Sequence, residues 1–343
     1  MTSSSPDGLL GITVAGYEFD RVVGLSSGRV PVDGCDVRFE TASIGDMNTH
    51  IFSGPGTREV SEVGLSPFLL AYANDDFRAY TLIPVFPLRL FRHKSIFIRK
   101  DSGISGPEDL RDRKVGTAGY STTSLTWIRG ILQHEYGVKP DEIRWVLSDE
   151  DSSAHLAGQR SDQELAIPDN VEVTYGMAGK DESDMLVDGD VDALFHAAEP
   201  RAFVEGNPQI ARLFPDSRIT ERSYFAKTGI FPIMHAVAIR SDVAEANPWL
   251  PEAVFHAYSA AKQQAYRGLR TTAWVMNSLP WLTQEAEATR DLMGENFWPY
   301  GIESNQTTLS AILQYSDEQG LTRRRLSVEE VFHPSTWKLT ETV

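Results

Sequence analysis

The sequence has a single cysteine, Cys35, and few basic residues, with 32 Lys and Arg against 48 Asp and Glu for a net charge of −16. One thiol excludes an intramolecular disulfide and a cysteine-rich metal cluster, and it fits a reducing compartment. The acidic excess argues against nucleic-acid or anionic-membrane binding, because such partners favour a basic surface. We therefore expect neither a nucleic-acid nor a membrane partner.

Long apolar runs are also missing. No stretch approaches the roughly 20 apolar residues that span a bilayer. The N-terminus, MTSSSPDGLLGITVAG, lacks the basic and apolar regions of a secretory signal, so we predict a cytoplasmic protein. The 343 residues, 41% of them hydrophobic, are enough for a two-domain globular protein with a full core.

Positive charge is concentrated in one interval. Between Asp76 and Asp101 there is no carboxylate. The same interval holds six basic residues: Arg78, Arg89, Arg92, Lys94, Arg99 and Lys100. Arg92 and His93 stand side by side just before a strand-like apolar run, and arginine suits bidentate carboxylate binding while histidine suits proton transfer. Both are candidate catalytic residues; the alternatives are a hinge salt bridge for Arg92 and a structural hydrogen bond for His93.

Short strand-like segments alternate with helical ones along the chain, which predicts an α/β fold with mostly parallel sheets. Their order suggests one lobe inserted into another, and the polar stretch 148–169 is expected as a loop. We predict a first lobe from residues 1–104 and 229–343, the second part of which includes C-terminal helices, and an inserted lobe from residues 105–228. Clefts between lobes are preferred ligand sites.

A Gly/Ser/Thr turn at 117–124 runs into a helix expected from about 122 to 136. Free backbone N–H groups at such a junction can bind an anion, although a plain N-cap at Ser121 is the simpler explanation. Arg129 falls on the apolar stripe of this helix and needs a carboxylate partner or a bound acid. The candidate substrate-binding residues here and in the first lobe are Tyr17, Ser66, Tyr120, Ser121, Thr122, Thr123 and Arg129.

Two further histidines precede or follow strand-like runs. His235 begins a run that mirrors the one after His93, and we take it as a third candidate catalytic residue, with a core histidine as the alternative. His196 and Glu199 follow a predicted strand end and are candidate substrate-binding residues. His93, His196, His235 and Glu199 could converge on a divalent metal, but no metal-binding spacing is present. We predict no cofactor and keep a divalent metal as the alternative.

Several stretches together resemble one family. They are RHKSIFIRKDSGISGPEDLRDRKVG, GYSTTSLTWIRGIL, TGIFPIMHAVAIR, PWL and LMGENFWPYG, and TGIFPIMH and FWPYG are the most specific parts. The sequence resembles the 4,5-dihydroxyphthalate decarboxylase family, itself similar to type II periplasmic solute-binding proteins, from about Gly11 to Phe332. The resemblance implies a two-lobed fold and non-oxidative loss of CO2 from an aromatic dicarboxylate, giving 3,4-dihydroxybenzoate.

The sequence departs from the family pattern at two places. His196-Ala-Ala-Glu199 stands where a proline-rich segment is expected, and the segment after Gly119 is rich in Ser and Thr. Both should face the cleft, so a related lyase acting on another aromatic acid is one alternative. A second is a solute-binding or sensing protein for a small aromatic acid. We also expect a homo-oligomer.

Overall fold

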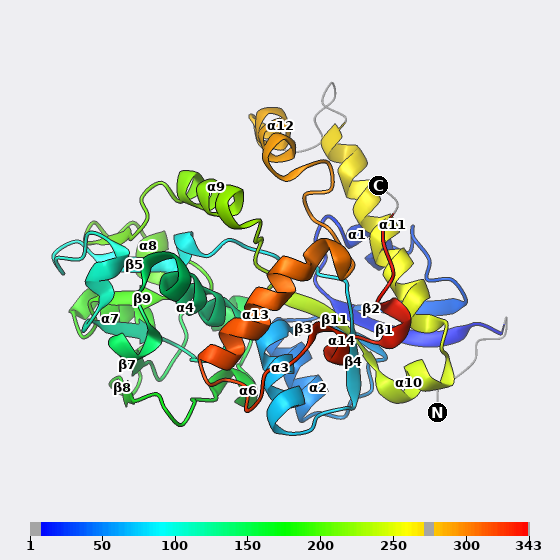
Figure 1. Ribbon diagram of the computed structural model, residues 1–343, viewed down its shortest axis with the longest axis horizontal. Helices are drawn as coiled ribbons and strands as arrows, with labels where there is room; N and C mark the ends of the chain where they lie inside the picture. Colours follow the sequence, from blue (N-terminus) through cyan, green and yellow to red (C-terminus); the bar gives the residue numbers. More distant parts are fainter. Residues whose placement is uncertain (1–7, 271–277, 342–343) are drawn as a thin grey trace.

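The computed structural model describes residues 8–270 and 278–341. Two sheets form the centres of two lobes (Figure 1). The first sheet has the order β2-β1-β3-β11-β4 and is mixed, because β11 pairs antiparallel with both neighbours. Its strands are β1 (Leu10–Gly16), β2 (Cys35–Thr41), β3 (Val60–Gly64), β4 (Tyr80–Ile83) and β11 (His235–Arg240).

The second sheet has the order β10-β5-β9-β6-β7-β8. Its β9-β6-β7-β8 part is parallel, and β5 and β10 add antiparallel pairings at one edge. Its strands are β5 (Ile96–Arg99), β6 (Lys114–Thr117), β7 (Arg144–Leu147), β8 (Val173–Tyr175), β9 (Ala193–Phe195) and β10 (Ile210–Arg212). The predicted α/β class is confirmed.

Helices cover these sheets (Figure 1). The helices that lie between the strands of the first sheet or after β11 along the chain include α1 (Val23–Ser26), α2 (Ile44–Phe52), α3 (Leu65–Asn74), α10 (Ser241–Ala246), α11 (Leu250–Arg270) and α14 (Val328–Val331). The helices that lie between β5 and β11 along the chain are α4 (Thr123–Tyr136), α5 (Ala154–Ala157), α6 (Asp162–Leu165), α7 (Glu182–Asp188), α8 (Arg201–Val204) and α9 (Ser217–Thr228). None of the helices in the described ranges combines the length and apolar character needed to cross a membrane.

The chain crosses between the sheets twice, after β4 and before β11. The two crossing segments lie antiparallel: the Leu90 N–H donates to the Pro232 carbonyl at 3.1 Å and the Met234 N–H donates to the Leu88 carbonyl at 2.8 Å. Arg89 is buried and fastens this pair, since its guanidinium donates to the carbonyls of Phe231 and Pro299. The basic interval of the sequence therefore lies against the segment that leads into His235.

The C-terminal part adds a third link between the lobes. After α12 (Leu282–Met293), α13 (Gln306–Glu318) runs between α3 and α4 and packs against both (Figure 1). Gly130 of α4 is required here, because a Cβ at this position would come within 2.0 Å of the Tyr315 ring. Beyond α13, the Arg129 guanidinium donates to Gln319 Oε1 at 2.8 Å.

Three local expectations differ from the structure. β5 lies before residue 104, within the predicted first lobe, and yet it belongs to the second sheet, because it pairs antiparallel with β9 and β10. The polar stretch 148–169, expected as a loop, contains the short helices α5 and α6. The N-cap of α4 is Thr122, not Ser121, since the Thr122 hydroxyl accepts the Leu125 N–H.

Candidate active site

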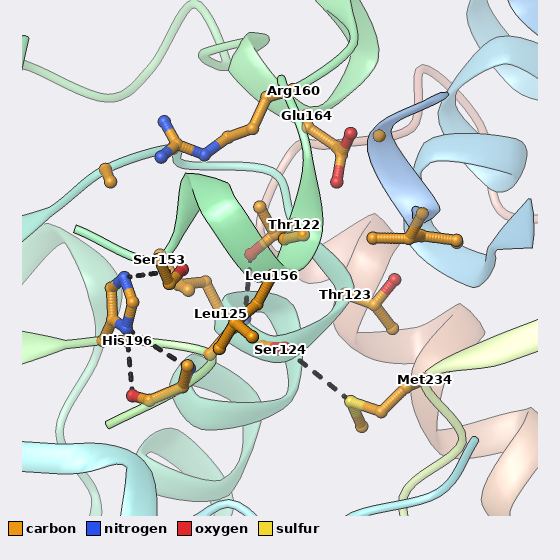
Figure 2. Close-up of a pocket in the computed structure, with 18 of the residues that line it drawn as sticks. Thr122, Thr123, Ser124, Leu125, Ser153, Leu156, Arg160, Glu164, His196 and Met234 are labelled. Atoms are coloured by element: carbon orange, nitrogen blue, oxygen red, sulfur yellow. Dashed lines mark hydrogen bonds between the residues drawn. The ribbon is translucent and has the colours of Figure 1, made fainter. Parts of the chain in front are cut away.

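A cavity of about 280 Å³ lies at the junction of the two lobes, near the lower end of the range for small-molecule sites. Its walls come from the β1–α1 loop, α2, the first crossing segment, the start of α4, the segment 151–164 and the residues after β9. Figure 2 shows the start of α4 between His196 on one side and Met234 on the other. A cavity of this size suits a ligand with one aromatic ring.

His235 lines this cavity at the first residue of β11. Its Nδ1 lies 2.5 Å from Oε1 of Glu62, and Glu62 is only 1% exposed in the centre of β3. The other carboxylate oxygen of Glu62 accepts the Tyr17 N–H at 3.2 Å. The carboxylate therefore fixes the ring of His235 and leaves Nε2 as the nitrogen available to a ligand.

Tyr17 lines the cavity beside His235, with ring centroids 6.3 Å apart. The Tyr17 hydroxyl accepts the Ile44 N–H at the start of α2, at 2.7 Å. Burial raises the pKa of Tyr17, so the phenol is neutral at physiological pH. Tyr17 thus offers an uncharged aromatic edge and a hydroxyl near the histidine.

Arg92 lines the cavity from the first crossing segment and is 3% exposed. Its guanidinium donates to the Ala197 carbonyl at 2.7 Å and contacts the sulfur of Met234 at 2.8 Å. Burial lowers the pKa of Arg92 to about 10, which still leaves it cationic at neutral pH. Among residues 8–270 and 278–341 no carboxylate forms a salt bridge with it, so a buried cation faces the cavity without an anionic partner.

The first turn of α4 forms another part of the wall. Thr122, Thr123, Ser124 and Leu125 all line the cavity. The first N–H groups of a helix lack intrahelical partners and favour negative charge. Ser66 lies behind this turn, because its N–H donates to the Thr123 hydroxyl at 3.0 Å and its side chain is fully buried.

The opposite wall carries a charged group on the second lobe. His196 lines the cavity just after β9, and its Nε2 lies 3.1 Å from Oδ1 of Asp151. Burial alone would lower the pKa of His196, but the hydrogen bond to Asp151 and the charge of Glu182 raise it. Arg160 also lines the cavity and pairs with the other oxygen of Asp151.

His93 lies outside the cavity, in the short 3-10 turn before β5. Aromatic rings enclose it, with centroids 5.2 Å away for Phe214 and Tyr224 and 6.4 Å for Tyr136. Within the described residues neither ring nitrogen has a hydrogen-bond partner, and burial lowers the pKa of His93 to about 4. The structure therefore contradicts a role for His93 as a general acid near neutral pH.

The buried imidazole of His93 predicts acid sensitivity. The unfolded chain binds a proton at the ordinary histidine pKa of 6.5, whereas the folded chain resists protonation down to about 4. The free energy of unfolding therefore falls as pH falls through this window, by about 3 kcal/mol in total. His93→Leu removes this loss. Between about pH 7 and about pH 4.5, the free energy of unfolding from urea titrations should therefore drop less in His93→Leu than in the native chain.

The matched control for this prediction is His256→Gln, because His256 lies on the exposed side of α11. The control should lose as much stability on acidification as the native chain. An equal drop in His93→Leu and the native chain would contradict a neutral buried His93.

Four other predicted residues are held by the protein itself. Tyr120 is fully buried, lies 3.8 Å beneath the Arg129 guanidinium and packs on Trp145. Arg129 does not line the cavity, and its guanidinium donates to Gln319 and to the Tyr120 carbonyl instead of a bound acid. Ser121 is buried and donates its hydroxyl to the Ala166 carbonyl. Glu199 points to Arg212, 2.9 Å away.

The metal set considered from the sequence does not converge. His93 sits among aromatic rings, Glu199 pairs with Arg212, and His235 pairs with Glu62. Within the described residues, His196 is the member of that set that belongs to a group of three potential ligands, together with Asp151 and Glu182.

The sequence interpretation missed Glu62, Asp151 and Arg160. Glu62 had a usable signal: a carboxylate in the middle of VSEVG, a strand with every residue buried, needs a partner inside the protein. Asp151 and Arg160 lie in the polar stretch that resembled a loop, and nothing in that stretch distinguishes them from surface residues.

Two lobes joined by antiparallel crossings, with a small cavity at their junction, define a chain with the periplasmic-binding-protein-like fold. Solved structures agree on the fold. The aliphatic sulphonate binding protein SsuA from Escherichia coli aligns with a TM-score of 0.53 at 15% identity, over 95% of this chain and 98% of that one. SsuA from Xanthomonas axonopodis pv. citri, bound to MOPS, aligns with a TM-score of 0.51 at 11% identity, over 94% and 98%.

Sequence relatives define the family more narrowly. The NMT1/THI5 like family model matches residues 90–205. A 4,5-dihydroxyphthalate decarboxylase from Comamonas testosteroni is 32% identical over 95% of this chain and 97% of its own length. One from Pseudomonas putida is 29% identical over 60% of this chain and 78% of its own length. The chain belongs to the 4,5-dihydroxyphthalate decarboxylase family.

Proposed function

We propose that this protein is a carboxy-lyase that converts 4,5-dihydroxyphthalate to 3,4-dihydroxybenzoate and CO2. The observation that carries the proposal is the 32% identity over nearly the whole chain with a decarboxylase of that name. The cavity supports it independently, since one wall has a guanidinium that forms no salt bridge within the described part of the chain and another has a histidine held by a buried carboxylate.

The chemistry sets the requirements. Direct loss of CO2 would leave an electron pair in a ring σ orbital, whereas protonation of the carboxylate-bearing carbon avoids this. The proton adds to that carbon, the carbon–carboxylate bond breaks, and its electrons return to the ring as CO2 leaves. The site must therefore donate a proton, hold the carboxylate that stays, and support the ring hydroxyl that is para to the protonated carbon.

The residues of the cavity divide into these roles. His235 donates the proton from Nε2, and Glu62 stabilises the protonated ring and holds its orientation. Arg92 and the first turn of α4 bind the retained carboxylate, with two parallel N–H groups of the guanidinium replacing the contact to Met234. Tyr17 and Thr122 border the ring.

The direct test is to incubate the purified protein with 4,5-dihydroxyphthalate and follow CO2 release together with the aromatic product by chromatography. Stoichiometric 3,4-dihydroxybenzoate and CO2 are the expected result. Saturable binding without turnover would instead favour the binding or sensing alternative. A screen of other ortho-substituted aromatic acids would then separate a related lyase from a pure binding protein.

Location and assembly remain predictions. We expect a cytoplasmic homo-oligomer, on the acidic composition and single thiol of the chain. Light scattering of the purified protein would give the oligomeric state.

A further inference from the structure

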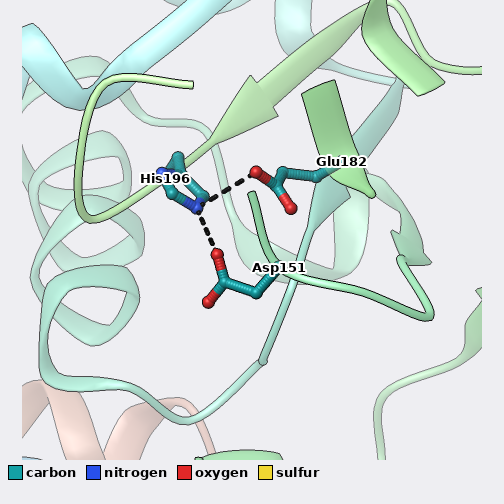
Figure 3. Close-up of side chains that lie close together, drawn as sticks. All are labelled: Asp151, Glu182 and His196. Atoms are coloured by element: carbon teal, nitrogen blue, oxygen red, sulfur yellow. Dashed lines mark hydrogen bonds and ion pairs between the residues drawn. The ribbon is translucent and has the colours of Figure 1, made fainter. Parts of the chain in front are cut away.

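Three potential metal ligands meet at one wall of the cavity, and Figure 3 shows them together. Asp151 follows β7, Glu182 is the first residue of α7, and His196 follows β9. Nε2 of His196 lies 3.1 Å from Oδ1 of Asp151 and 3.3 Å from Oε1 of Glu182. All three ligand atoms lie within 4.8 Å of one another.

The two distances from Nε2 of His196 fit a divalent cation between these ligands. Ligands about 2.0–2.1 Å from a tetrahedral metal lie about 3.3 Å from each other. Two carboxylate oxygens around one imidazole nitrogen also require a positive charge between them, which either a proton on Nε2 or a metal ion supplies. The side chains are largely buried, with exposures of 4% for His196, 0% for Glu182 and 12% for Asp151.

An outer layer of hydrogen bonds fixes each of the three side chains, as metal ligands require. Nδ1 of His196 lies 2.9 Å from the Ala198 carbonyl and 3.2 Å from the Ala198 nitrogen, and the tautomer with the proton on Nδ1 turns the lone pair of Nε2 toward the carboxylates. The N–H of Ser153 donates to Asp151 at 2.8 Å, and the N–H of Ser152 donates to Glu182 at 3.1 Å. Arg160 contacts Oδ2 of Asp151, whereas Oδ1, the oxygen nearer to His196, accepts the Ser153 N–H and keeps a further lone pair for a metal.

The site formed by Asp151, Glu182 and His196 opens toward the cavity. Asp151, Ser153 and His196 line the cavity, whereas Glu182 lies behind them. Three protein ligands and one position open to a cavity are typical of catalytic rather than structural metal sites. We propose that Asp151, Glu182 and His196 bind one divalent cation, of the kind that histidine and carboxylate ligands favour, such as Zn²⁺ or Mn²⁺.

Under the proposed function, on which this role rests, the open position takes a ring hydroxyl of the aromatic acid. A metal lowers the pKa of a bound hydroxyl, so the hydroxyl would bind as phenolate and release its proton to solvent. The phenolate then feeds electrons toward the carbon that His235 protonates. The metal and the histidine would thus act on the ring from different walls of one cavity.

Metal binding is tested without substrate. The native chain, stripped with a chelator, is titrated with Zn²⁺ and with Mn²⁺ by calorimetry, and we expect one equivalent of at least one metal to bind with a Kd on the order of micromolar or tighter. His196→Gln and Glu182→Gln should each weaken binding at least about tenfold. The matched control is His134→Gln, which removes another histidine–carboxylate pair, 2.7 Å to Glu318, and should bind like the native chain.

Absence of saturable binding of both metals, or equal affinity in the native chain and both site variants, would overturn the site and leave a proton as the occupant. Should a variant fail to fold, X-ray absorption of the metal-loaded native chain decides the matter. One imidazole with oxygen ligands is expected, and a shell without imidazole would refute the assignment.

Turnover is then measured separately. Loss of decarboxylation on chelation and recovery with metal would support the role in the reaction. Full turnover in excess chelator would overturn that role. A chain that binds metal at the site but releases no CO2 would refute the proposed function and leave the metal site standing.

Discussion

Replacing His235 with glutamine is expected to lower kcat for decarboxylation by about 10²–10⁴-fold, the usual contribution of a positioned general acid. Glutamine keeps a polar side chain of similar length but carries no proton that titrates near neutral pH. The measurement is steady-state CO2 release, with thermal unfolding to confirm that the variant is folded. Turnover at the native rate would remove His235 from the mechanism.

The partner of His235 gives a finer test. Glu62→Gln keeps a hydrogen-bond acceptor at Oε1 and removes the negative charge 2.5 Å from the imidazole. The carboxylate orients the imidazole and stabilises its protonated form, so the loss of the anion should lower kcat while KM changes little. A native kcat in a folded Glu62→Gln variant would mean that Glu62 has only a structural role.

The second large effect is expected at Arg92. Arg92→Gln should lower kcat/KM by about 10²–10³-fold, because a charged hydrogen bond to the retained carboxylate is lost in a buried site. The kcat/KM of Arg92→Lys should lie between those of the native chain and Arg92→Gln, since an ammonium keeps the charge but cannot form the paired contact. Calorimetry compares the affinity for 3,4-dihydroxybenzoate with that for catechol, which lacks the carboxylate. The native chain should prefer 3,4-dihydroxybenzoate, and Arg92→Gln should abolish this preference.

Arg89 provides the matched control for Arg92. It lies three residues away, is equally buried, and forms no salt bridge within residues 8–270 and 278–341, but its guanidinium serves the carbonyls of Phe231 and Pro299 outside the cavity. Arg89→Lys should reduce stability and leave the ratio of the two ligand affinities unchanged. A similar loss of preference in both variants would show that Arg92 acts through the fold alone.

The sequence predicted the parts of the fold that depend on local pattern. The alternation of strands and helices and the helix from Thr123 to Tyr136 follow from apolar periodicity, and the two crossings follow from the order of the elements. The edge placement of β5 could not be predicted in this way, because pairing with β9 and β10 depends on chain segments about 100 residues away.

The sequence could identify site residues such as Arg92 and His235, whose charged or titratable side chains stand out next to apolar runs. It could not identify residues whose role depends on partners from distant parts of the chain. His93 and Arg92 are adjacent, yet the turn before β5 directs one ring into an aromatic box and the neighbouring guanidinium into the cavity. Arg129 meets a glutamine 190 residues further along the chain. No pattern in a single sequence encodes such a partner.

The position of α13 has a consequence for dissecting the molecule. A fragment cut near residues 95 and 213 would contain every strand of the second sheet and would resemble an independent domain on a topology diagram. It would nevertheless leave Gly130 without Tyr315 and the buried guanidinium of Arg129 without Gln319. The inserted lobe is thus contiguous in sequence but borrows part of its interior from the C-terminus, so the chain should unfold as one cooperative unit.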